Sequence, residues 1–64
     1  MFREVKYITI RTKKKTVEHS NRSGLVRFGI EGNSLLVITE KDGKTKVKVY
    51  QLSDILGFEF ETIQ

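Results

Sequence analysis

The sequence predicts an all-β domain of mainly antiparallel strands, a small five- to six-stranded curled sheet or barrel with one short helical turn near residues 53–56. Three observations predict it. β-branched and aromatic residues dominate the ordered stretches, alanine and proline are absent, and apolar residues alternate with polar ones in several short runs. With 64 residues and no cysteine, we expect one domain, 1–64, with a thin core that no disulfide reinforces.

The first predicted strand, Arg3–Arg11, changes parity in its middle. Val5 and Tyr7 share one face, whereas Ile8 and Ile10 share the other. This change indicates either a β-bulge or a strand with apolar contacts on both sides. Further strands are expected at Lys15–His19, Leu25–Glu31, Leu35–Glu40, 44–50 and Phe58–Thr62, with turns at 20–24 and 32–34.

Asp42-Gly43, between two alternating runs, is typical of a two-residue hairpin turn with positive φ. Such a turn fixes the register, so that Ile38 faces Val47 and Leu36 faces Val49 on one apolar face. The opposite face then carries Leu35 with Tyr50, Val37 with Lys48 and Thr39 with Lys46.

A helical turn is expected after this hairpin. Ser53 would cap it, Asp54 suits its positive N-terminal end, and Gly57 would end it in a left-handed conformation. Leu52, Ile55 and Leu56 would close one end of the sheet. In the last strand, Phe58 and Phe60 are expected to point inward, and Glu59 and Glu61 outward.

The net charge of +4 is unevenly distributed, since residues 1–32 carry +5 and residues 33–64 carry −1. A basic surface attracts acidic partners. Lysines alternating along a strand beside an aromatic could follow a phosphate backbone, and a cationic loop could neutralise further phosphates. The candidate nucleic-acid-binding residues are Arg11, Lys13, Lys14, Lys15, Arg22, Lys44, Lys46, Lys48 and Tyr50.

Each basic group also has a purely structural interpretation. Lysines on an outer strand keep a sheet edge from pairing with other chains, and a run of lysines is commonly a solvated loop. The alternative function is a protein–protein interaction module, either a homodimer or a small phage-type inhibitor of a host protein. Its interface would be a strand edge or a patch formed by Leu35, Val37 and Tyr50.

Catalysis, metal binding and a cofactor are not expected. His19 is the only imidazole, and the four serines stand in turn or cap contexts without a spaced base. The longest apolar run, Leu35–Ile38, is far shorter than the roughly 20 residues that cross a bilayer. We therefore expect a cytoplasmic, non-catalytic binding module whose partner is nucleic acid or an acidic protein surface, with no membrane association.

Overall fold

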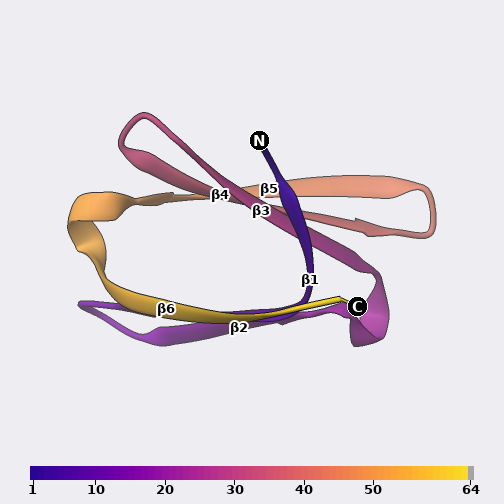
Figure 1. The fold of residues 1–64 in the computed structure, drawn as a ribbon, viewed down its shortest axis with the longest axis horizontal. Coiled ribbons are helices and arrows are strands. Elements are labelled where there is room, and N and C mark those ends of the chain that lie inside the picture. The colour runs from indigo at the N-terminus through magenta and orange to yellow at the C-terminus, as the bar shows by residue number, and fades with distance from the viewer. Residues whose placement is uncertain (64) are drawn as a thin grey trace.

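The computed structural model describes residues 1–63, and they form six antiparallel strands in a curled half-barrel (Figure 1). One layer holds β2, β1 and β6, and the other holds β3, β4 and β5. This architecture confirms the predicted fold class. The strands are β1 Arg3–Thr12, β2 Thr16–Ser20, β3 Leu25–Glu31, β4 Ser34–Lys41, β5 Lys44–Gln51 and β6 Ile55–Thr62; the 3-10 turns are η1 Asn21–Ser23 and η2 Leu52–Asp54.

Strand β1 connects the two layers. Its first residues, Arg3 and Glu4, pair with β3, and its remainder pairs with β2 on one side and β6 on the other. Lys6 is an extra residue, because Val5 pairs with Thr62 while Tyr7 pairs with the preceding residue of β6. The parity change in the sequence is therefore a β-bulge, which bends the strand between the layers.

The core lies between the layers and consists of seven buried side chains. They are Val5, Ile8, Ile10, Val26, Phe28, Leu35 and Val37, drawn from β1, β3 and β4. Phe28 packs against Phe58 and Phe60 of β6, with ring centroids 5.9 and 4.8 Å apart. Both aromatics of β6 therefore face inward as predicted, although Phe60 remains 36% exposed.

The β4–β5 hairpin has the predicted register and turn. Leu36 pairs with Val49 and Ile38 with Val47, and the turn residues Asp42 and Gly43 have φ values of 54° and 76°. The apolar face that these pairs form points outward, with Val47 55% and Val49 57% exposed. The opposite side of β4, which carries Leu35 and Val37, supplies the core instead.

The segment after β5 differs from the expected helical turn. The turn η2 spans Leu52–Asp54; Gln51 occupies its N-cap position without a side-chain hydrogen bond, and Ser53 lies inside the turn. Gly57 does not end a helix but belongs to β6, where the Arg11 guanidinium covers it closely. Leu52 and Ile55 pack against the core as expected, whereas Leu56 is 64% exposed.

Two glycines give a test of the backbone geometry. A Cβ at Gly24 would collide with the carbonyl oxygen of Glu40, whereas nothing lies within 4 Å of a Cβ at Gly43. We expect Gly43→Ala to cost about 1 kcal/mol from its left-handed φ alone. Gly24→Ala adds a backbone clash and is expected to cost about 3 kcal/mol. Urea unfolding of both variants measures the difference, and equal costs would contradict the close approach of β3 to β4 at this point.

Candidate functional site

The two layers leave one side of the half-barrel open. Within residues 1–63, β2 pairs only with β1 and β5 pairs only with β4, so each presents a free edge. A groove of about 900 Å³ lies between them. Its walls include Glu18 and His19 from β2 and the lysines of β5, with Val26 at its base.

The lysines of β5 stand on one rim of this groove. Lys44, Lys46 and Lys48 alternate with outward residues, so neighbouring side chains leave the strand about 6.7 Å apart. They share the inner face of the layer with Phe28 and Val37. All three lysines are nonetheless exposed. Tyr50, the next residue on the same face of β5, is the one that packs against the core.

A second lysine group, Lys13, Lys14 and Lys15, lies in the β1–β2 turn. The Thr12 hydroxyl accepts hydrogen bonds from the backbone of Lys14 and Lys15, at 3.3 and 3.1 Å, and donates to the Lys15 carbonyl. The Lys13 N–H donates to the Asp54 carbonyl of η2 over 3.1 Å. These bonds hold the turn as a defined structure next to the end of β5.

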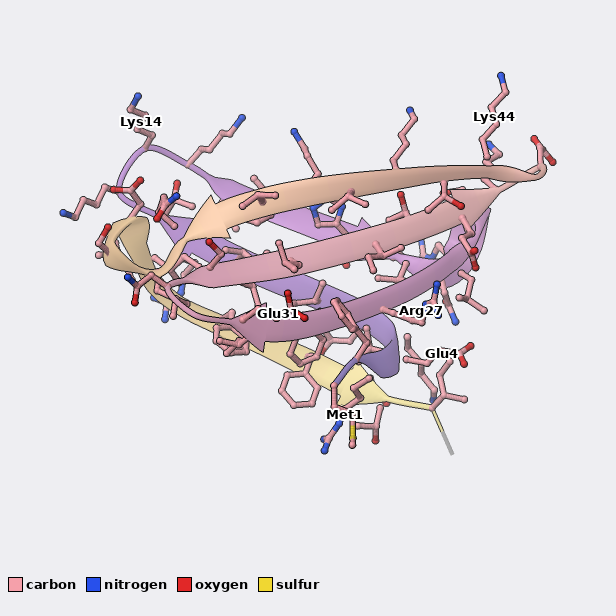
Figure 2. All side chains as sticks on the ribbon, turned by 90° about the horizontal axis from the view of Figure 1, so that it is seen from above. Met1, Glu4, Lys14, Arg27, Glu31 and Lys44 are labelled. Carbon is pink, nitrogen blue, oxygen red and sulfur yellow. The ribbon has the colours of Figure 1, made fainter. Side chains whose placement is uncertain are left out.

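Tyr50 lies between the two groups. It lines a hollow of about 440 Å³ together with Val49 and Lys13, Lys14 and Lys15. In Figure 2, Lys14 and Lys44 mark the two ends of one edge of the domain, and further nitrogen-tipped side chains project between them. We name Lys13, Lys14, Lys15, Lys44, Lys46 and Lys48 the lysine rim.

Tyr50 also joins the two free edges. Its hydroxyl shares a hydrogen bond of 2.8 Å with Nε2 of His19, and the rings meet edge to face with centroids 6.1 Å apart. Burial lowers the pKa of His19 below its ordinary 6.5, and the nearby charge of Lys48 lowers it further. Burial also raises the pKa of Tyr50. Both groups are therefore neutral at neutral pH, and the bond joins β2 to β5 across the groove.

Other predicted site residues lie elsewhere. Arg11 points to the outer face of the β2–β1–β6 layer, where its guanidinium covers Gly57. Arg22 lies in η1, at the opposite end of the domain from the β1–β2 turn (Figure 1). Leu35 and Val37 are fully buried, which removes them from any surface patch and leaves Tyr50 alone of those three.

Acidic residues lie both on the outer face of the β2–β1–β6 layer and beside the lysine rim. Cross-strand pairing places Glu18, Glu59 and Glu61 on the outer face of the β2–β1–β6 layer, around Thr9. Lys6 of the bulge lies 3.5 Å from Glu61. Of the three, Glu18 also borders the groove, as do Glu40 and Asp42 at the hairpin end. Asp54 likewise lines the hollow of Lys13, Lys14 and Lys15, so acidic side chains lie beside the lysine rim as well as on the outer face.

The sequence identified the lysines, but it gave no role to His19. Alternation along β2 could have indicated the position of His19. Val17 and His19 share a face of this strand, and pairing of β2 with β1 places that face beside Ile10 and Ile8.

Within residues 1–63, no group of three metal-ligating side chains comes together. No helix in the same range has the length and apolar character to cross a membrane. Comparison with protein-family models, curated proteins and solved structures finds no match for this chain.

The single imidazole makes the His19 environment measurable by NMR titration. We expect a midpoint below 6.5, and Lys48→Gln is expected to raise it part of the way because only the charge contribution is removed. Lys44→Gln, two lysines further along β5, serves as the matched control and leaves the midpoint unchanged. A midpoint at or above 6.5 in the unmodified protein would contradict the buried contact with Tyr50.

The same pKa shift makes stability depend on pH. Because the unfolded chain binds the His19 proton more tightly than the folded one, stability is complete above pH 6.5. It falls as the pH drops from 6.5 towards the lowered folded pKa, and this contribution then becomes constant. Urea midpoints across that range measure the loss. His19→Gln is expected to remove this step, and a step that persists in His19→Gln would assign it to other groups.

Proposed function

We propose that this domain is a non-catalytic binding module that engages an acidic polymer, nucleic acid, along the lysine rim. The observation that carries the proposal is the convergence of two lysine groups on either side of Tyr50, although the β1–β2 turn and β5 are distant in the sequence. The tight turn at Thr12 and its bond to Asp54 hold the first group beside the second.

The chemistry of the rim favours phosphates over bases. Lysine ammonium groups are flexible point charges that neutralise phosphates and release counterions without reading the sequence. Tyr50 contributes little stacking surface, since its ring is partly buried and its hydroxyl is bonded to His19. We therefore propose binding with little base specificity, driven by charge.

The environment of His19 supports a non-catalytic role. A general base needs hydrogen-bond reach to a nucleophile or to a substrate proton. The Nε2 atom of His19 is instead engaged with the phenol of Tyr50. This pair joins the two edge strands, which is a structural use of both side chains.

The salt dependence of binding to single-stranded and duplex oligonucleotides tests the proposal. With six lysines available, we expect a log–log slope of about −4 to −5. The double variant Lys46→Gln/Lys48→Gln is expected to flatten the slope by about 1.5, because two phosphate contacts are lost.

The matched control is Arg3→Gln/Lys6→Gln, which removes the same charge from the first half of β1. Lys6 is paired with Glu61, and Arg3 lies over the Phe60 ring, away from the lysine rim. We expect its slope to equal that of the unmodified protein. Absence of binding at low ionic strength, or equal losses in both double variants, would overturn the proposal.

A further inference from the structure

His19 and Tyr50 stand between the two parts of the lysine rim. His19 lines the groove together with the lysines of β5, whereas Tyr50 lines the hollow together with the lysines of the β1–β2 turn. Their hydrogen bond of 2.8 Å therefore lies between the groove and the hollow. Both side chains remain partly exposed. A polymer that contacts both lysine groups must therefore pass beside this pair.

We propose that His19 is a further binding residue of the lysine rim, which takes up a proton from solvent when a polyanion binds and then adds a positive charge to the site. This inference rests on the proposed function, since it concerns the same surface and the same class of partner. It assigns a ligand-binding use to a side chain whose contact with Tyr50 otherwise only joins β2 to β5. It also predicts that the domain binds polyanions more tightly as the pH falls.

The surroundings of His19 keep its imidazole neutral in the free domain at neutral pH. Burial lowers the pKa of His19, and the charge of Lys48 on β5 lowers it further. The neighbours from β1 and β3 are apolar, since its cross-strand partner is Ile8 and Val26 lies at the base of the groove. The turn η1, which follows β2, carries Arg22. The other charged residues that line the groove are Glu18, Glu40, Lys41, Asp42, Lys44 and Lys46. Among all these charges, Lys48 is the one that shifts the pKa of His19, so a phosphate that neutralises Lys48 would change it.

A phosphate bound at Lys48 reverses this effect. Its negative charge offsets the ammonium group that opposes protonation, and it also attracts the imidazolium directly. The pKa of His19 is therefore expected to rise in the complex, although burial continues to oppose the charged form. Protonation also preserves the contact with Tyr50, because an imidazolium donates from both ring nitrogens and the phenol oxygen can accept from Nε2.

Thermodynamic linkage relates this protonation to the strength of binding. The factor by which the bound polyanion strengthens proton binding at His19 equals the factor by which the proton strengthens polyanion binding. Affinity is therefore constant above the pKa that His19 has in the complex, rises as the pH falls towards its pKa in the free domain, and is constant again below that pKa. We expect a rise of about fivefold, at the lower end of usual couplings, because the groove is open to solvent and burial still opposes the charge.

The affinity for an oligothymidylate without terminal phosphates, measured from about pH 8 to about pH 5.5 at constant low ionic strength, tests the proposal. Neither its bases nor its phosphodiesters titrate in this range, so the protein supplies any pH dependence. We expect about fivefold tighter binding at the lower pH in the unmodified protein and no such rise in His19→Gln, whose amide can still bond to Tyr50 and whose NMR spectrum checks its fold. An NMR titration of His19 is expected to show a higher midpoint with the oligonucleotide than without it, by the logarithm of the same factor.

The matched control is Arg3→Gln/Lys6→Gln, which removes charge away from the lysine rim and is expected to keep the full rise. Binding that does not depend on pH, a rise that persists in His19→Gln, or an NMR midpoint that the oligonucleotide leaves unchanged would overturn this inference and leave the lysine rim as the binding surface. Absence of binding at every pH at low ionic strength would instead overturn the proposed function, and this inference with it.

Discussion

The bulge at Lys6 is the constraint on which the half-barrel depends. A regular strand would send Val5 to the opposite face from Ile8 and Ile10, and one of the two groups would then lie in water. The extra residue brings all three into the core and bends β1, so that one strand pairs with β3 at its start and with β2 and β6 afterwards. Without this bend the two layers would not enclose a common interior.

Local patterns in the sequence were sufficient for most strands and turns, but not for the segment after β5, where η2 and the start of β6 replace the expected helical turn. They were also insufficient for the choice of the buried face. The Asp42-Gly43 turn fixes its register through backbone conformation alone, and the hairpin formed as predicted. In β4, however, Leu35–Ile38 is apolar on both sides, so alternation does not decide which side is buried. Tertiary packing determines which side of β4 is buried, because Phe28 of β3 pairs with Val37 and its ring contacts the aromatic rings of β6.

The same reasoning explains which parts of the candidate site were predictable. The row of lysines on β5 follows from register, which the sequence specifies. The approach of Lys13–Lys15 to Tyr50 depends on the contact of the β1–β2 turn with η2, two elements far apart in the chain. Arg11 belongs to the same basic run, but parity along β1 sends it to the outer face. Basic residues that are close together in the sequence therefore do not always belong to the same charged surface.

Alternation along a single strand gives β5 two different sides. Its even-numbered lysines belong to the lysine rim, whereas Val47 and Val49 point outward beside Ile38 and Leu36. The two sides are not independent surfaces, because Val47 also lines the groove and Val49 also lines the hollow beside the β1–β2 turn. A polymer held along the lysine rim would therefore meet apolar as well as charged side chains of the same strand.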